Sequence, residues 1–210
     1  MTQLILVRHG ETAWNVDRVY RGRSDVSLNE QGVAQAKLLG EYLGEWALEA
    51  VYSSPLQRAR ATAEAIARPH GIAVTIAPAL VDFDYGDWQG SPEHDIIKRY
   101  PQLYAEWLTA PHRVRMPSGE SLAEVAERAS AFVEHIIAAH TDGVLLVSHR
   151  VVNKVLICRL LELDNSHFWS IRQDVGGITM FDYENGRFIL SRHNDTSYSR
   201  GLAHKRLGDF

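Results

Sequence analysis

The chain has 210 residues, of which 45% are hydrophobic and 23% are charged, and its net charge at pH 7 is −4. This composition predicts a globular protein with a full hydrophobic core, built as a single domain over residues 1–210. The slightly acidic balance argues against nucleic acid or a membrane surface as the main partner. Any attraction for an anion must therefore come from a local cluster of cations.

No apolar run reaches the roughly 18 residues that a membrane-spanning helix requires. Residues 1–3 lead directly into a predicted strand, which leaves no room for a signal peptide. The single cysteine, Cys158, cannot form an internal disulfide, as is usual in a reducing compartment. We therefore expect a cytoplasmic protein without a membrane segment.

The first predicted strand, residues 4–7, is a run of four apolar side chains, which is typical of a strand buried on both faces. The run stops at Arg8 and His9. In an open α/β sheet the carboxyl ends of the strands form the ligand crevice, so we expect both side chains to face a substrate. The polar segment that follows carries three further cations: Arg18, Arg21 and Arg23.

Strand-like and helix-like segments then alternate along the chain. Helices are predicted over residues 29–43 and 56–67, and strands over residues 50–53 and 72–77. Arg58 falls within the second helix, near its positive end. This βαβα order favours a three-layer α/β sandwich with a mostly parallel central sheet and helices on both faces.

The segment over residues 91–119 breaks this rhythm. It holds four of the seven prolines, and proline interrupts helices, so we predict short helices and loops that form a small cap over the crevice. We expect the aromatic residues in and near the cap to form mainly a satellite core beneath its loops: Trp88, Tyr100, Tyr104 and Trp107.

The last part of the chain repeats the pattern of the first strand. A long helix over residues 118–140 leads to a second buried strand over residues 144–147. That strand also ends in a polar residue and a histidine, Ser148 and His149. A further helix and a hairpin with an Asn-Gly turn are predicted over residues 151–161, 177–183 and 187–192.

Two histidines at strand ends, with Arg8 and Arg58 nearby, suit a phosphoryl group. Guanidinium offers a planar fork to two phosphate oxygens, and the start of a helix adds N–H donors. Neutral imidazole can attack phosphorus, and an ordinary histidine pKa of about 6.5 leaves a neutral fraction at pH 7. These residues predict a phosphate pocket in which a histidine nucleophile needs a fixed tautomer.

Further motifs run in order over nearly the whole chain: residues 6–15 (LVRHGETAWN), Gly22 with Asp25 and Leu28, residues 53–59 (SSPLQRA) with Thr62 and Ala63, residues 85–90 (YGDWQG), residues 118–121 (SGES) and residues 147–149 (VSH). In these motifs the chain resembles the histidine phosphatase superfamily, in its phosphoglycerate mutase-like branch. The resemblance implies that His9 is the phosphorylated nucleophile and that Asn15 helps line the site. The phosphoryl oxygens would be held by Arg8, Arg58 and His149. No metal and no cofactor are implied.

The expected mechanism needs an acid that later acts as a base. Members of the family usually place a glutamate there, two residues after a leucine, whereas this chain has Asp82 after Leu80. The aspartate is one methylene shorter, and a displacement of about 1 Å can cost roughly a hundredfold in rate. Asp84 is the reserve candidate.

Other departures from the family pattern concern the substrate. The glutamine usual before Gly22 is Arg21, and the glycine frequent after His149 is Arg150. Candidates for substrate contacts are Asn15, Arg21, Gly22, Arg23, Tyr85, Arg150, Tyr198 and Arg200. The sequence at residues 110–114, 119–122 and 165–169 resembles the metal-independent phosphoserine phosphatases of this branch.

The compact cap favours water as the acceptor of the phosphoryl group, because cofactor-dependent mutases of this family carry extra segments that exclude water. We therefore predict a metal-independent phosphomonoesterase that hydrolyses a small-molecule phosphate ester through a phosphohistidine on His9. Two alternatives stay open. One is phosphoryl transfer of the cofactor-dependent phosphoglycerate mutase type, and the other is a phosphate-binding regulatory protein that lost turnover at Asp82. A homodimer is among the assemblies we consider.

Overall fold

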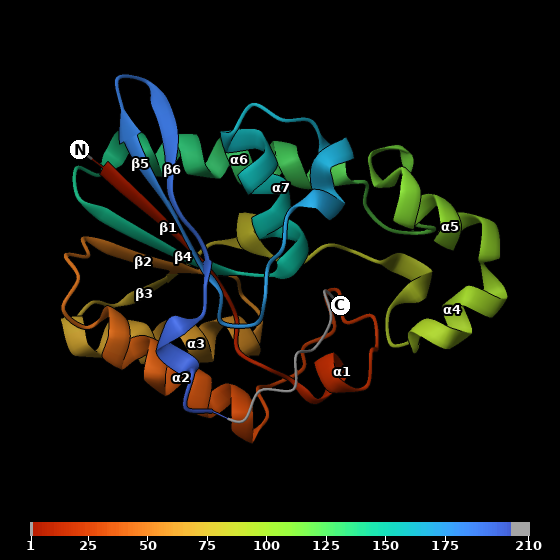
Figure 1. Ribbon diagram of the computed structural model, residues 1–210, viewed down its shortest axis with the longest axis horizontal. Coiled ribbons are helices and arrows are strands. Elements are labelled where there is room, and N and C mark those ends of the chain that lie inside the picture. Colours follow the sequence, from red (N-terminus) through yellow and green to blue (C-terminus); the bar gives the residue numbers. More distant parts are fainter. Residues whose placement is uncertain (1, 203–210) are drawn as a thin grey trace.

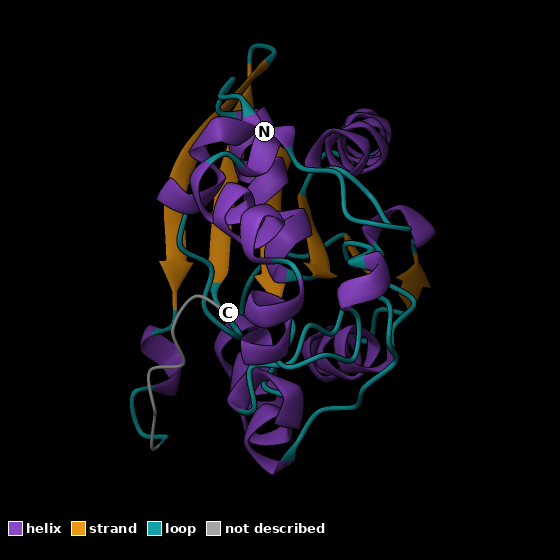
Figure 2. Ribbon diagram, turned by 90° about the vertical axis from the view of Figure 1, so that its right-hand side faces the viewer, coloured by secondary structure: helices purple, strands orange, loops and turns teal. Residues whose placement is uncertain are grey.

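Six strands form one sheet in the computed structural model, which describes residues 2–202. The strand order is β3-β2-β4-β1-β5-β6, and Figure 2 shows several neighbouring arrowheads pointing the same way. The strands span Thr2–Arg8 (β1), Ala50–Ser53 (β2), Val74–Ile76 (β3), Gly143–Ser148 (β4), Ile178–Glu184 (β5) and Arg187–Asp195 (β6). Strands β1 to β4 pair in parallel, and β5 pairs antiparallel with both β1 and β6. The predicted, mostly parallel sheet is confirmed.

Helices cover both faces of this sheet, with α2 and α3 on one face and α6 and α7 on the other (Figure 1). Helix α2 begins after Asn29, whose side chain accepts a hydrogen bond from the Gly32 N–H. Helix α6 begins with a capping box between Ser121 and Glu124. The α-helices span Ala13–Val16 (α1), Glu30–Leu43 (α2), Gln57–Ala67 (α3), Glu93–Arg99 (α4), Pro101–Thr109 (α5), Leu122–Ala139 (α6) and Arg150–Leu160 (α7). Within residues 2–202, no helix combines the length and apolar character needed to cross a membrane.

Strand β1 lies at the centre of the core because its side chains alternate between two apolar layers. Leu4 and Leu6 pack in the layer that contains α6 and α7. Ile5 and Val7 pack in the layer that contains α2 and α3. All four side chains are fully buried. The unbroken apolar run is therefore explained by helices on both faces of the sheet, as the sequence predicted.

The two edges of the sheet differ in how well the sequence predicted them. Asn185 and Gly186 both have positive φ, 51° and 79°, as a two-residue hairpin turn requires, and they join β5 to β6. Strand β3 is shorter than the predicted 72–77, because this edge strand pairs with β2 only from Val74 to Ile76 and a turn begins at Pro78.

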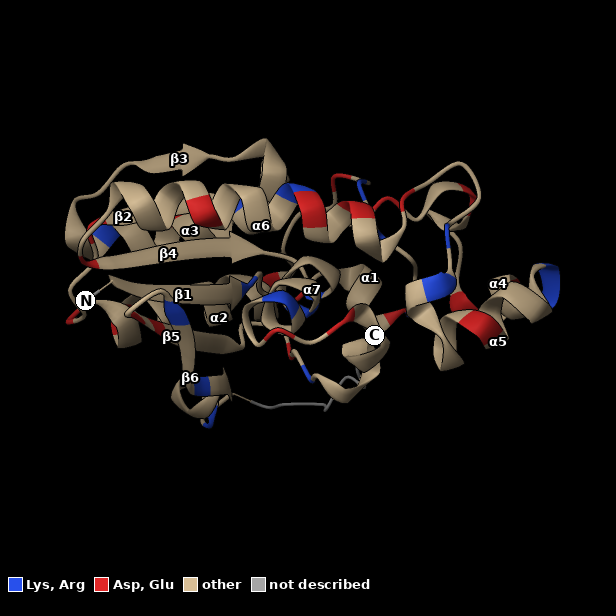
Figure 3. Ribbon diagram, turned by 90° about the horizontal axis from the view of Figure 1, so that it is seen from above, with Lys and Arg blue, Asp and Glu red and all other residues tan. Residues whose placement is uncertain are grey.

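The predicted cap contains α4 and α5, which lie beyond the carboxyl ends of the parallel strands (Figures 1 and 3). Its aromatic residues do not form a separate satellite core, which corrects that expectation. The buried side chains of Trp88 and Trp107 belong to the same apolar layer as α6 and α7. The physical link is a stack of Trp107 on Phe83, with ring centroids 5.7 Å apart, and a contact of Trp107 with Phe168 at 5.4 Å. The cap is thus anchored to the main core.

Candidate active site

His9 and His149 lie side by side at the ends of the central strands β1 and β4. The register pairs Arg8 with Ser148, and the His9 N–H donates to the Ser148 carbonyl at 3.0 Å. The two imidazole rings have centroids 5.1 Å apart, and both are buried. Parallel pairing therefore brings together the two strand ends that looked alike in sequence.

The tautomer of His9 is fixed by its own loop. Its Nδ1 lies 2.7 Å from the Gly10 carbonyl, which can only accept, so Nδ1 carries the hydrogen and Nε2 keeps its lone pair. Burial, and then the positive charge of Arg58, hold the pKa of His9 well below its ordinary value of 6.5. His9 is therefore neutral at pH 7 and has the form that a nucleophile requires.

Two arginines at the predicted pocket are held by backbone carbonyls. Arg58, in the first turn of α3, donates from Nη1 to the Ser24 carbonyl at 2.9 Å and from Nη2 to the Gly22 carbonyl at 2.8 Å. Arg8 donates from Nη1 to the Gln173 carbonyl at 2.6 Å. Both side chains are almost fully buried, and these carbonyls fix the positions of their guanidinium groups.

Asp82 lies with these groups, whereas Asp84 does not. The Asp82 Oδ2 is 2.9 Å from Arg58 Nη2 and 3.5 Å from His149 Nδ1. The Asp84 carboxylate accepts from the Gly86 N–H at 2.9 Å and lies 3.4 Å from Arg23. The structure thus separates the two carboxylates that the sequence left as alternatives.

The orientation of His149 depends on Ser54, which belongs to the SSPLQRA motif but was not predicted as a site residue. His149 Nε2 lies 2.7 Å from Ser54 Oγ, and that oxygen accepts from the Leu56 N–H at 3.3 Å. The Ser54 hydroxyl hydrogen can be donated to His149 Nε2, and the Nδ1 of the ring faces Asp82. Burial, followed by the charge of Arg58, lowers the pKa of His149 well below 6.5.

The predicted substrate residues have different surroundings. Asn15 is buried, and its Oδ1 accepts from the Thr12 N–H and Thr12 hydroxyl, both at 2.9 Å. Its Nδ2 has no hydrogen-bond partner among residues 2–202. Arg150 Nη2 donates to the Tyr85 hydroxyl at 3.1 Å. Gly22 contributes its carbonyl to Arg58, and its φ of +49° favours glycine.

Two further candidates are engaged in other contacts. Arg23 donates to Glu120 at 2.8 Å, in a partly exposed ion pair. Tyr198 donates to the Gly176 carbonyl at 2.9 Å and stacks on Tyr42. These contacts connect segments that are distant in the sequence, so both side chains stabilise the loops that carry them. Of the last two candidates, Arg21 is buried and Arg200 is exposed.

Sequence reasoning missed the residues that hold the Asp82 loop. Arg128, on α6, donates from Nη1 to the Ala79 carbonyl at 2.6 Å and from Nη2 to the Asp82 carbonyl at 3.3 Å. Glu120 in turn accepts from Arg128 at 3.1 Å. Glu120 belongs to the SGES motif, which therefore signals more than the beginning of a helix.

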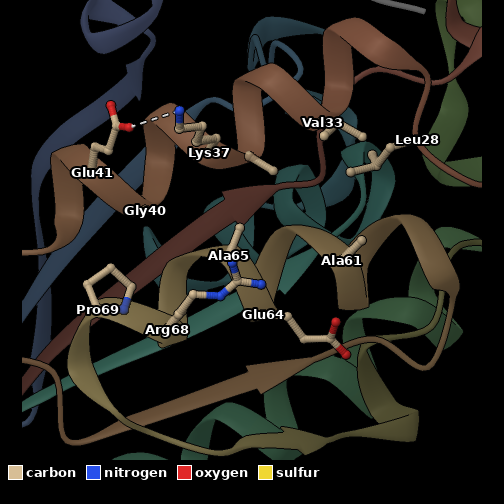
Figure 4. A pocket seen from close by; sticks show the side chains of 11 residues that line it. Leu28, Val33, Lys37, Gly40, Glu41, Ala61, Glu64, Ala65, Arg68 and Pro69 are labelled. Atoms are coloured by element: carbon tan, nitrogen blue, oxygen red, sulfur yellow. Dashed lines mark ion pairs between the residues drawn. The ribbon is translucent and has the colours of Figure 1, made fainter.

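A groove of about 550 Å³ lies between α2 and α3 on the surface (Figure 4). Its wall includes an ion pair between Lys37 and Glu41 at 3.8 Å. None of the predicted site residues lines this groove. It is therefore distinct from the cluster of predicted site residues at the strand ends.

Comparison with known proteins agrees with this geometry. Phosphoserine phosphatase 1 of Hydrogenobacter thermophilus is 36% identical over 199 residues, which is 94% of each chain. The adenosylcobalamin/alpha-ribazole phosphatase of Salmonella typhimurium is 32% identical and covers 94% of this chain and 98% of its own. The solved structure of Bacillus stearothermophilus YhfR superposes with a TM-score of 0.90 at 33% identity, covering 94% of this chain and 99% of that one. The family model of the histidine phosphatase superfamily (branch 1) matches residues 4–196, and the chain belongs to that family, as its motifs predicted.

Proposed function

We propose that this chain is a phosphomonoesterase that hydrolyses a small-molecule phosphate ester through a phosphohistidine on His9, without a metal. The observation that carries the proposal is the neutral, tautomer-fixed imidazole of His9 beside His149 and the buried arginines. The names of the relatives, which are phosphatases of different small phosphate esters, support the reaction class.

In the first step, His9 Nε2 attacks phosphorus and the ester P–O bond breaks. Arg8 and Arg58 neutralise charge on the phosphoryl oxygens, and His149 donates a hydrogen bond from Nδ1. The departing alkoxide takes a proton from the Asp82 carboxyl group, which lies beside Arg58 and His149. The alcohol leaves, and the phosphoryl group stays on His9.

In the second step, water attacks the phosphohistidine in line with the N–P bond. The Asp82 carboxylate takes a proton from that water, the bond to His9 Nε2 breaks and inorganic phosphate leaves. Asp82 is then protonated again and His9 is neutral, so the site is ready for another ester. Asn15, whose Nδ2 is unpartnered within the described chain, supplies a further donor to the phosphoryl group.

The experiment measures phosphate release in the presence of a chelator, with an aryl phosphate, phosphoserine and 3-phosphoglycerate as substrates. We expect wild type to release phosphate and His9→Ala to release none, while His167→Ala, a change of an exposed histidine, serves as the control. Rapid quenching in alkaline denaturant should trap a base-stable, acid-labile phosphoryl group on wild type and on His167→Ala, and none on His9→Ala.

The same experiment separates the two alternatives. A phosphate-binding protein would bind inorganic phosphate and release none from any ester. A mutase would need a phosphorylated cofactor and would return the phosphoryl group to a second hydroxyl rather than to water. Either result, or full activity of His9→Ala, would contradict the proposal.

A further inference from the structure

One loop, residues 173–177, holds the end of strand β1. The Arg8 N–H donates to the Gly177 carbonyl at 3.2 Å. The Gly176 N–H donates in the opposite direction, and lies 3.1 Å from the Arg8 carbonyl and 3.2 Å from the His9 carbonyl. The backbone of the two residues that act at phosphorus is therefore bound by this segment, which we call the 173–177 loop.

Gln173 connects the loop to the guanidinium of Arg8. Its backbone carbonyl accepts from Arg8 Nη1 at 2.6 Å. Its side chain is fully buried and closes the loop, because Nε2 donates to the Gly177 carbonyl at 3.0 Å. The Thr179 hydroxyl on β5 donates to Gln173 Oε1 at 3.4 Å. The loop thus fixes both the charged end and the backbone of Arg8.

Asn194, near the end of the edge strand β6, binds the loop with both ends of its amide. Its Oδ1 accepts from the Asp174 N–H at 2.8 Å, and its Nδ2 donates to the Asp174 carboxylate at 3.0 Å. The amide fits here because residue 177 is a glycine: an added Cβ at Gly177 would lie 2.3 Å from Asn194 Oδ1. Asn194 therefore packs directly against the loop.

Tyr198, in the turn after β6, binds the loop at Gly176. Its hydroxyl donates to the Gly176 carbonyl at 2.9 Å. Burial raises the pKa of Tyr198, so the phenol keeps its hydrogen at neutral pH. The N–H of the same glycine donates to the Arg8 and His9 carbonyls, so one residue of the loop links the tyrosine to the strand end.

We propose that Asn194 and Tyr198 are positioning residues for the reaction at phosphorus. Through the 173–177 loop they hold Arg8 and His9 in the geometry that the attack requires. This inference rests on the proposed phosphatase function. A displacement of about 1 Å at a reacting group can cost roughly a hundredfold in rate, so a loosened loop should slow the chemical step more than it weakens binding of the ester.

The first test removes a single hydroxyl. Tyr198→Phe keeps the ring that stacks on Tyr42, with centroids 5.7 Å apart, and loses the donor to Gly176. In rapid-quench kinetics with an alkyl phosphate, we expect the maximal rate of phosphorylation of His9 to fall about fivefold to tenfold. The ester concentration that gives half of this rate should change by less than about twofold.

Tyr42→Phe is the matched control, because it removes a hydroxyl from the other ring of the same stack. That hydroxyl bonds with Asp195 and Arg192 instead of with the loop, so the control should keep the wild-type rate. An unchanged rate in Tyr198→Phe, or an equal loss in Tyr42→Phe, would overturn the proposal. A smaller amount of phosphohistidine formed at an unchanged rate would overturn it too, because only the folded fraction would then have changed.

The second test removes the amide of Asn194. Its φ is +48°, which glycine adopts without strain, so Asn194→Gly removes the side chain and leaves the backbone conformation accessible. Because two contacts to Asp174 are lost, we expect the phosphorylation rate to fall about tenfold or more. A wild-type rate would overturn the role of Asn194. If this variant does not fold, as judged by its thermal transition, Tyr198→Phe decides the outcome.

A magnetic resonance measurement separates failure of this inference from failure of the proposed function. The His9 Nδ1–H signal, assigned by its loss in His9→Ala, reports the 2.7 Å contact with the Gly10 carbonyl and needs no turnover. We expect this signal to shift in Tyr198→Phe and to stay in place in Tyr42→Phe. If wild type hydrolyses no ester and the shift is seen, the positioning role stands and the proposed function fails. If wild type turns over and Tyr198→Phe changes neither the rate nor the signal, the proposed function stands and the positioning role is refuted.

Discussion

Asp82→Asn separates an acid–base role from a purely electrostatic one. The amide is nearly isosteric, so it can still accept from the Phe83 N–H, which Asp82 Oδ1 does at 2.8 Å. It cannot deliver or take a proton. Asp84→Asn is the matched control, since Asp84 lies with Arg23 and Gly86 instead of with the histidines.

The expected size of the effect depends on the leaving group. General acid catalysis contributes about 10²–10⁴-fold, so we expect kcat/KM for an alkyl phosphate to fall by that factor. An aryl phosphate leaves as a stabilised phenoxide, so phosphorylation of His9 should slow by less than about tenfold. Dephosphorylation still needs the base and should become rate-limiting. Replacing the carboxyl group that accepts from the buried Arg58 at 2.9 Å should also lower the free energy of unfolding by about 1–3 kcal/mol.

The assay is rapid-quench kinetics with both ester types. Asp82→Asn should give a burst of phenol with an aryl phosphate, equal in amount to the enzyme, and should accumulate phosphohistidine. Asp84→Asn should show neither effect. If aryl and alkyl esters lose activity by the same factor and no burst appears, Asp82 acts by positioning Arg58 and the acid–base assignment is wrong.

Three further predictions follow from single contacts. Ser54→Ala removes the 2.7 Å contact to His149 and should lower kcat/KM about tenfold while the thermal transition remains cooperative. Burial, and then the charge of Arg58, lower the pKa of His9, so the acid limb of the kcat/KM profile should lie below pH 6.5. The stability that depends on neutral His9 should be present above pH 6.5 and should be lost as the pH falls toward the lowered pKa. Thermal denaturation of His9→Ala should lack this pH-dependent contribution. Gly86 and Gly71 both have positive φ, but only at Gly86 would an added Cβ lie 1.9 Å from a carbonyl oxygen, that of Pro117. In denaturant unfolding, Gly86→Ala should therefore destabilise the protein by more than about 3 kcal/mol, and Gly71→Ala by about 1–2 kcal/mol.

The local parts of the fold could be predicted from the sequence because their causes are local. The apolar run at residues 4–7 indicates a strand buried on both faces, and the Asn29 and Ser121 caps mark helix starts. Positions that depend on tertiary contacts could not be predicted. The cap aromatics merge with the main core through Trp107 and Phe83, two residues far apart in the chain.

The candidate site also combines features that the sequence predicts with features that depend on tertiary contacts. The residue types and their places at strand ends pointed to His9, His149 and the arginines. The resemblance to the family put Asp82 first and Asp84 in reserve, and Asp82 is the carboxylate that lies beside them, but the contacts that hold its loop could not be predicted. Gln173 was missed for a similar reason: its backbone carbonyl, which accepts from Arg8, leaves no signature in a side-chain pattern.

The position of the backbone at Asp82 explains how this short side chain reaches Arg58. Three carbonyls close together in that loop are held by side chains: Ala79 and Asp82 by Arg128, and Leu80 by the Ser148 hydroxyl at 2.8 Å. Ser148 is the last residue of β4 and directly precedes His149, so the strand end that positions the second histidine also positions the loop that carries Asp82. The loop therefore brings the carboxylate to Arg58 without the extra methylene of a glutamate. Since the site around Asp82 is buried, a longer side chain there would have to displace the carboxylate or the loop.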